Sequence, residues 1–187
     1  KRKNPNRNLE GRIMRTELLF CGFGGQGIIF AGKIMGQAGV AAKLETAQSA
    51  SYGSEARGSA CHAGVVVSTE QIGYPKVTKP DILVAMSQEA YDKFINTVKS
   101  GGTVFYDSHL VNATETEGVV QNAIPATSLA TDIGRRGVAN VVMLSAMVAS
   151  SGIVSKDNLQ DTLDEQSPPA FKEINGNAVD AGFGFKG

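Results

Sequence analysis

A glycine-dense turn constrains the fold of this chain more than any other feature. Residues 22–27 read Gly-Phe-Gly-Gly-Gln-Gly, and they satisfy the G-x-G-x-x-G pattern. The preceding residues 17–21 predict a short buried strand, and the apolar spacing from Ile28 to about Gly39 predicts a helix. A strand, a glycine turn and a helix in this order are typical of an anion-binding Rossmann-like unit. The candidate ligand-binding residues of this turn are Gly22, Gly24, Gly25, Gln26 and Gly27.

Alternating strand and helix patterns continue along most of the chain. They predict a single α/β domain with a Rossmann-like, largely parallel sheet flanked by helices. Loop residues are expected over 48–59, and an irregular tail is expected from about residue 168. Strands are predicted over 40–47, 61–69, 81–86, 103–107 and 120–124. Two helices are predicted over 127–133 and 155–165. Two more are predicted from their ends: one from a Ser87 cap to Gly101, and one from an Asn140 cap to just before Gly152.

The formal net charge is zero, but the charge is divided unevenly. Residues 1–15 carry six basic side chains against Glu10 alone, a net charge of +5, while the other 12 basic and 17 acidic residues leave −5. An acidic body argues against nucleic-acid binding by the fold. Residues 1–13 are interpreted as a disordered basic extension or a cloning remnant, with a nucleic-acid-binding arm as the alternative. The domain is expected over residues 14–187.

Cysteine content limits the metal chemistry available to the chain. The two cysteines, Cys21 and Cys61, cannot form a Cys₄ iron–sulfur cluster, and no Cys-x-x-Cys zinc motif occurs. We therefore predict no metal site, and so few cysteines favour a reducing, cytoplasmic setting. Apolar stretches of four or five residues are far shorter than the ~20 residues needed to span a bilayer, so no membrane association is predicted.

The glycine turn alone leaves two functions open. Glu45 follows Gly27 by eighteen residues, close to the position of the ribose-binding carboxylate in dinucleotide-binding folds. The chain would then be an NAD-binding oxidoreductase. Alternatively, the turn packs on a partner or contacts a cofactor that another subunit holds. His62 and His109 lie in no recognisable acid–base arrangement, and no catalytic residue is assigned.

A second loop carries hydrogen-bonding groups at high density. Residues 51–58 read Ser-Tyr-Gly-Ser-Glu-Ala-Arg-Gly. Arg57 is able to bind a phosphate or carboxylate through two parallel hydrogen bonds. Tyr52 and Glu55 are further candidate binding residues. The alternative is a surface turn with a weak contact between Glu55 and Arg57, worth ~0.2–1 kcal/mol.

The two loops together resemble the gamma subunit of 2-oxoacid:ferredoxin oxidoreductases. The resemblance rests on residues 22–27 and 51–58, and it continues through Tyr74-Pro75, residues 79–81 and Asn140. It covers roughly residues 14–152. Ser59 departs from the pattern, because relatives often repeat glycine after Arg-Gly. The tail beyond Pro169 matches nothing in the family pattern.

The resemblance implies an accessory subunit of a larger enzyme of anaerobic metabolism. That enzyme converts a 2-oxoacid, expected here to be 2-oxoglutarate, and CoA to acyl-CoA and CO₂. Thiamine diphosphate with magnesium lies in alpha and beta subunits, a ferredoxin-like delta subunit often supplies iron–sulfur clusters, and ferredoxin accepts the electrons. This chain would bind no cofactor alone, although its loops would help to enclose CoA. The sequence contains no Gly-Asp-Gly segment for thiamine diphosphate. An indolepyruvate oxidoreductase subunit and a purely structural interface module remain alternatives.

Overall fold

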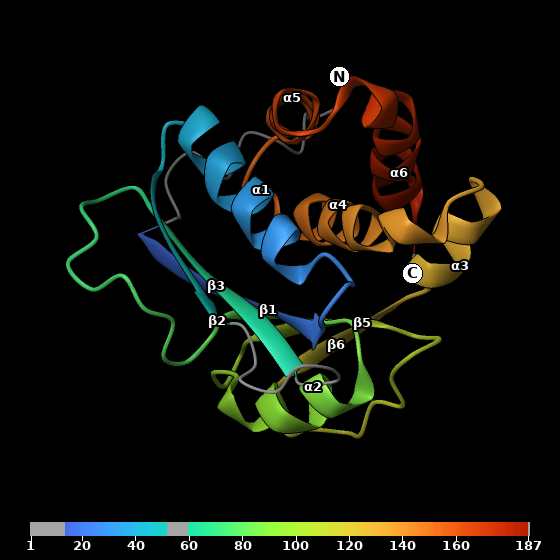
Figure 1. Ribbon diagram of the computed structural model, residues 1–187. Helices are drawn as coiled ribbons and strands as arrows, with labels where there is room; N and C mark the ends of the chain where they lie inside the picture. Colours follow the sequence, from blue (N-terminus) through green and yellow to red (C-terminus); the bar gives the residue numbers. More distant parts are fainter. Residues whose placement is uncertain (1–13, 52–59, 187) are drawn as a thin grey trace, which may run out of the picture.

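The computed structural model describes residues 14–51 and 60–186, so the predicted basic extension lies outside the described residues (Figure 1). The described part forms one six-stranded sheet with helices on both faces. The strand order across the sheet is β2-β3-β1-β4-β5-β6. The strands are β1 (Arg15–Phe23), β2 (Glu45–Ser51), β3 (Ala60–Ser68), β4 (Ile82–Ala85), β5 (Thr103–Asp107) and β6 (Val120–Ile124).

Strand β3 is the exception in an otherwise parallel sheet. It runs antiparallel to both of its neighbours, β1 and β2, whereas β4, β5 and β6 follow the direction of β1. Two antiparallel strands need only a short connection, and residues 52–59 are too few for the helical crossover that a parallel pair requires. The predicted α/β class with a largely parallel sheet is confirmed.

The two faces of the sheet are covered unequally. Leu18 and Phe20 of β1 join the larger core under α1 (Ile28–Ala41) and α4 (Ala139–Ser151). Leu19 and Cys21, which alternate with them, join a smaller core under α2 (Gln88–Phe94). Helices α1 and α4 lie on one side of the sheet in Figure 1 and α2 on the other. The larger face also carries α3 (Ala126–Asp132), α5 (Lys156–Gln166) and α6 (Lys172–Gly184).

Several predicted helix boundaries are confirmed, and others are wrong. The Ser87 side chain accepts a hydrogen bond from the Ala90 N–H and caps α2. Gly152 ends α4 in the left-handed conformation, with φ 66°. However, α2 ends at Phe94 and gives way to a 3₁₀ turn, so Gly101 does not terminate it. Asn140 lies inside α4 and does not cap it, because the helix begins one residue earlier.

The second strand and the C-terminal tail differ most from the sequence prediction. The predicted strand over 40–47 is confirmed only for residues 45–47, because α1 extends to Ala41 and Lys43 then turns the chain with φ 63°. Strand β2 therefore begins at Glu45 and includes residues 48–51, which were predicted as loop. The predicted irregular tail instead contains a 3₁₀ turn and helix α6. Ala178 and Val179 of α6 are fully buried in the larger core.

Glu17 of β1 fixes the segment that leads into β4. Its carboxylate accepts hydrogen bonds from the N–H groups of Thr78 (2.8 Å) and Lys79 (3.2 Å), and its own N–H donates to Asp81 Oδ2 (2.7 Å). Burial acts to raise the pKa of Glu17, but the hydrogen bonds from Thr78, Arg15 and Lys79 outweigh it, so the pKa lies below the ordinary value of 4.5.

We expect Glu17 to contribute to the loss of stability in acid. A depressed pKa gives stability that is present above the unfolded-state value and is lost as the pH falls through the folded-state value. Denaturant titrations between pH 7 and pH 3 should therefore show a shallower pH dependence for Glu17→Gln below about pH 4.5. Glu45→Gln, at an exposed glutamate that begins β2, is the control. Parallel curves for the Glu17 variant and the wild type would contradict the assignment.

Candidate functional site

The glycine turn links the carboxyl end of β1 to the first turn of α1. Gly25 and Gly27 adopt positive φ angles of 92° and 74°, which disfavour a side chain. Gly27 is the N-cap of α1, and its carbonyl accepts the first helical hydrogen bond from the Ala31 N–H (2.9 Å). The turn therefore has the strand-to-helix context that the sequence predicts, at the edge where open α/β sheets bind ligands.

Gln26 holds the turn together by joining two strand ends. Its Oε1 accepts a hydrogen bond from the Phe23 N–H (2.6 Å), and its Nε2 donates to the carbonyl of Met86 at the end of β4 (2.7 Å). A Cβ at Gly22 would lie 2.6 Å from Gln26 Oε1, so a side chain there would displace the Gln26 amide from its hydrogen bonds. The structure thus gives Gln26 and Gly22 a structural role in shaping the turn, and their predicted ligand contact stays a prediction.

Asn140 anchors the other end of the turn from α4. Its Nδ2 donates to the Gly27 carbonyl oxygen (3.2 Å), and a Cβ at Gly27 would overlap the same amide. The sequence predicts Asn140 at the start of the buried helix, but as its cap. Its spacing of 113 residues from Gly27 explains why no sequence pattern reveals the contact.

Gly24 is different, because nothing within the described residues requires glycine there. It is exposed, a Cβ would meet no atom within 4 Å, and its φ is not positive. A side chain at this position would project away from the turn. An exposed position without a steric reason for glycine suits close approach by a molecule outside the chain.

A pocket of about 300 Å³ opens beside the turn. Among the described residues that line it, Arg136 is the one charged residue and none is acidic. Arg136 is not among the residues predicted from the sequence, although the breaks at Gly134 and Gly137 indicate an unusual connection between two helices. The pocket is lined by Gly25, Gln26, Met86, Leu110, Thr127, Arg136, Gly137, Ala139 and Asn140.

The local electrostatics favour a negatively charged group in this pocket. Helix α1 begins at its wall and has no side-chain cap among the described residues, whereas a 3₁₀ turn (Arg136–Val138) leads into α4 and the Ala139 N–H donates to the Arg136 carbonyl. The uncapped N-terminus of α1 offers free N–H groups and a partial positive charge. Arg136 adds a full positive charge with planar donors that match phosphate or carboxylate oxygens. The arrangement is able to bind and orient an anion.

The second predicted loop lies mostly outside the described residues. Tyr52, Glu55 and Arg57 fall between residues 51 and 60, and their predicted binding roles stay predictions. The flanking strand ends are described: Ala60 pairs with Phe23 at the start of the glycine turn, and Ser51 pairs with His62. Both ends of the loop therefore lie at the same sheet edge as the turn.

Glu45 lies at the opposite end of the strands from the glycine turn. It pairs with Ser68, which pairs with Arg15 at the beginning of β1, whereas the glycine turn follows the end of β1. Seven residues separate Arg15 from Gly22, roughly 20 Å along a strand at ~3.3 Å per residue. A ribose hydroxyl bound near the turn could not reach Glu45. This geometry removes the observation that favoured an NAD-binding enzyme.

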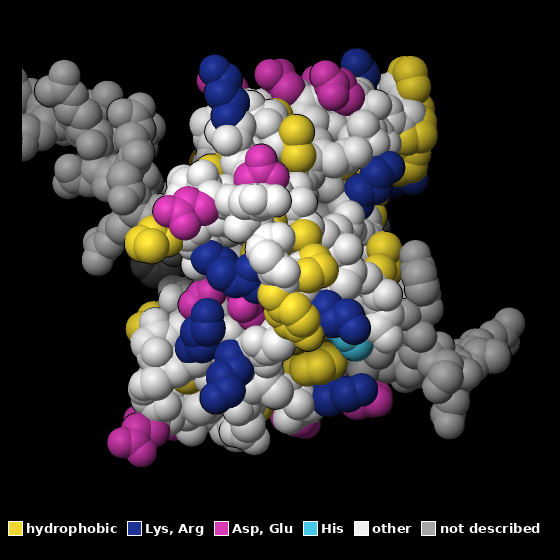
Figure 2. All heavy atoms as spheres, turned by 90° about the vertical axis from the view of Figure 1, so that its left-hand side faces the viewer, with side chains coloured by type: hydrophobic (Ala, Val, Ile, Leu, Met, Phe, Trp, Pro, Cys, Tyr) yellow, Lys and Arg dark blue, Asp and Glu magenta, His cyan; other side chains and the backbone are white. Residues whose placement is uncertain are grey.

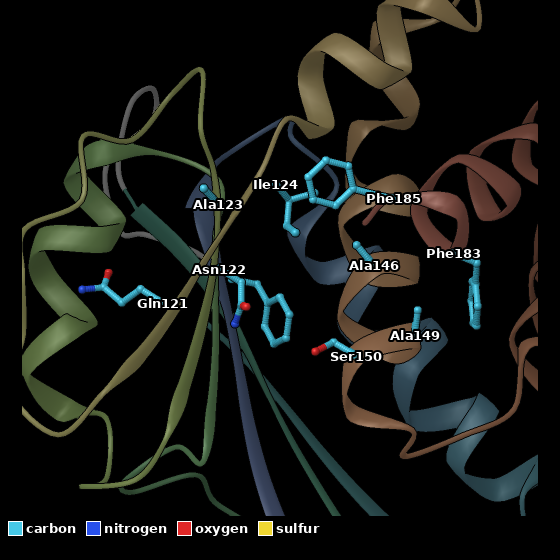
Figure 3. A pocket seen from close by; sticks show the side chains of 10 residues that line it. Gln121, Asn122, Ala123, Ile124, Ala146, Ala149, Ser150, Phe183 and Phe185 are labelled. Atoms are coloured by element: carbon cyan, nitrogen blue, oxygen red, sulfur yellow. The ribbon is translucent and has the colours of Figure 1, made fainter. Parts of the chain in front are cut away.

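Other parts of the described chain offer weaker sites. A larger cleft of about 470 Å³ lies between β6 and the helices α4 and α6, and Figure 3 shows Asn122, Ser150 and Phe185 around it. None of its lining residues is charged, and none belongs to the glycine turn.

Within residues 14–51 and 60–186, no group of three His, Cys, Asp or Glu side chains could hold a metal ion. No helix there is long and apolar enough to cross a membrane.

Comparison with known proteins identifies the family. Residues 17–185 match the pyruvate ferredoxin/flavodoxin oxidoreductase family. The chain is 43% identical to the 2-oxoglutarate synthase subunit KorC of Methanocaldococcus jannaschii, over 91% of this chain and 93% of the relative. It is 41% identical to the same subunit of Methanothermobacter marburgensis, over 90% and 95%.

A solved structure agrees with these sequence relatives. The gamma subunit of a keto/oxoacid ferredoxin oxidoreductase from Geobacter sulfurreducens superposes with a TM-score of 0.80 at 38% identity, covering 90% of this chain and 96% of that one. The resemblance inferred from the two loops is thereby confirmed. This chain belongs to the pyruvate ferredoxin/flavodoxin oxidoreductase family, as a gamma subunit.

Proposed function

We propose that this chain is the gamma subunit of a 2-oxoglutarate:ferredoxin oxidoreductase and that its glycine-turn pocket binds an anionic group of CoA. The 2-oxoglutarate assignment is supported by the names of the two KorC relatives, which align over nearly their whole length. The observation that carries the binding role is the pocket between α1 and α4, where the uncapped N-terminus of α1 and Arg136 face a space that no acidic side chain of the described residues lines.

The residues present fit a phosphate group of CoA. Gly24 and Gly25 leave the backbone of the turn open to close approach, and Gln26 and Asn140 hold that backbone in place from two sides. Preorganised N–H donors lose little entropy when they bind an anion. In this proposal the chain positions CoA and shields it from water, and it performs no chemical step itself.

The remaining chemistry belongs to partner subunits in this proposal. When bound there, thiamine diphosphate with magnesium supplies the carbanion chemistry of decarboxylation, and iron–sulfur clusters carry the electrons toward ferredoxin. Alpha and beta subunits, and a ferredoxin-like delta subunit, are the proposed partners. The loop that carries Tyr52, Glu55 and Arg57 is proposed to close the CoA site, because its flanking strand ends lie beside the glycine turn.

Reconstitution tests the proposed function. The isolated chain should fold but should reduce no viologen dye in the presence of 2-oxoglutarate and CoA. Co-expression with its alpha and beta subunits should give dye reduction that requires both substrates and all subunits. Rates with pyruvate, 2-oxoisovalerate and indolepyruvate would test the substrate assignment. Turnover by the rigorously purified chain alone, or full activity of a complex that lacks it, would refute the proposal.

A further inference from the structure

A second feature lies on a different face from the glycine-turn pocket. Three exposed lysines, Lys76, Lys79 and Lys93, surround the partly buried side chains of Val77 and Phe94. We name these five residues the basic face. In the lower half of Figure 2, basic side chains gather around a hydrophobic group with a histidine beside it.

The centre of the basic face is apolar and shallowly hollowed. Val77 and Phe94 line a cavity of about 140 Å³ together with His62, whose ring centroid lies 5.2 Å from that of Phe94. Thr78 joins this cavity to a neighbouring hollow lined by Lys79 and Lys99. The Lys93 Nζ lies 5.4 Å from the centroid of the Phe94 ring, so its charge stands at the rim.

The positive charge of the basic face is largely uncompensated. Lys99 beside it is paired with Asp81 (2.8 Å), but no carboxylate of the described residues forms an ion pair with Lys76, Lys79 or Lys93. Burial and the nearby Lys93 lower the pKa of His62, so the three lysines supply the charge at neutral pH. Three unpaired lysines around an apolar centre form a surface that complements acidic side chains.

The segment that carries two of these lysines is rigidly held. The buried carboxylate of Glu17 accepts hydrogen bonds from the backbone N–H groups of Thr78 and Lys79. Asp81, two residues further, accepts the N–H of Glu17 and pairs with Lys99. A surface fixed in this way binds a partner with little ordering cost.

From the charge and shape of the basic face, we propose that it docks a small acidic electron-carrier protein of the ferredoxin class. The inference rests on the proposed function, since the carrier would be the electron acceptor of the assembled enzyme. An apolar centre within a charged rim is the usual anatomy of a protein–protein interface. Nucleic acid is a poorer fit, because the basic face carries only three lysines and the other 15 basic and 18 acidic residues of the chain leave a net charge of −3. The role is docking alone, and it places no redox group on this chain.

The test compares two electron acceptors in the reconstituted complex. The variant Lys76→Glu/Lys79→Glu/Lys93→Glu should raise the KM for a purified acidic ferredoxin at least tenfold at low ionic strength. Its kcat and KM with methyl viologen should stay unchanged, because a small cationic dye needs no docking surface. Added salt should weaken ferredoxin reduction by the wild type and have less effect on the variant.

A matched variant separates local from global charge. Lys33→Glu/Lys172→Glu/Lys186→Glu makes the same charge change at exposed lysines of α1, α6 and the C-terminal segment, and it should leave the ferredoxin KM within about twofold of the wild type. An unchanged ferredoxin KM in the basic-face variant, or equal effects in both variants, would overturn the proposal. So would dissociation of the variant complex on a sizing column, which would show that the basic face is a subunit interface.

Loss of binding to a DNA oligonucleotide or to phosphatidylglycerol vesicles, with an unchanged ferredoxin KM, would assign the face to that ligand. If the wild-type complex turned over with neither acceptor, the proposed function itself would fail.

Discussion

Replacing Arg136 with alanine is expected to raise the KM for CoA by about 10- to 100-fold in the reconstituted enzyme, with little change in the KM for 2-oxoglutarate. Within the part of the chain that the structure describes, Arg136 is the one charged residue that lines the pocket beside the glycine turn. A hydrogen bond to a charged group contributes ~1.5–3 kcal/mol, and each ~1.4 kcal/mol is a factor of ten in affinity. Steady-state rates at varied CoA, with dye as acceptor, measure the effect.

The chain contains a close control for this substitution. Arg135 is also exposed, but its guanidinium lies over the Phe171 ring, 4.2 Å from the centroid, and it does not line the pocket. Arg135→Ala should therefore leave the KM for CoA unchanged. Arg136→Lys should rescue poorly, because an ammonium lacks the planar fork of donors. An Arg136→Ala complex that assembles normally with an unchanged KM for CoA would remove Arg136 from the site.

Gly24→Ala probes the same site by steric means. Since a Cβ at Gly24 meets no atom of the described residues within 4 Å, the substitution should leave the melting temperature nearly unchanged. It should nevertheless raise the KM for CoA if CoA approaches the turn closely. Gly73→Ala is equally unhindered within the described residues but lies outside the glycine turn, and it should change neither quantity. A Gly24 variant that assembles poorly but binds CoA normally would assign the turn to a subunit interface.

Replacing Gly182 with alanine is expected to destabilise the fold by roughly 1–3 kcal/mol, because it overpacks the contact between α6 and α4. A Cβ at this position would lie 2.5 Å from the Val142 carbonyl oxygen and 2.9 Å from the Ala146 nitrogen. Both are backbone atoms of a buried helix, so relief requires α6 to move away. Thermal unfolding should show a melting temperature lowered by about 2–12 °C.

Gly176→Ala supplies a control of opposite sign in the same helix. Its Cβ would meet only the Gln160 side chain, at 3.9 Å, which is ordinary van der Waals contact. Alanine is favoured over glycine inside a helix by ~0.8–1.0 kcal/mol, so this variant should be slightly more stable than the wild type. Equal melting temperatures for the Gly182 and Gly176 variants would show that α6 does not pack on α4 as described.

Sequence alone determined the elements with strong local patterns. The buried strands β4 and β5 are short apolar runs, and β1, the glycine turn and α1 follow one another with a change in periodicity at Ile28. The Ser87 cap and the Gly152 terminus are also local, since each uses backbone groups within four residues. The two loop motifs were sufficient to predict the family, because their combination is specific where the glycine turn alone is common.

Tertiary structure decided the features that depend on residues far apart in the chain. Helix α6 contains three glycines and two asparagines, which disfavour helix formation, and it forms because Ala178 and Val179 bury against α4 and α5. Asn140 was interpreted as a cap because its partner, Gly27, lies 113 residues away. Glu45 had the correct spacing for a ribose ligand, yet α1 extends further than predicted and places it at the start of β2. Arg136 reaches the glycine turn only because α4 packs beside α1, a juxtaposition that sequence spacing does not encode.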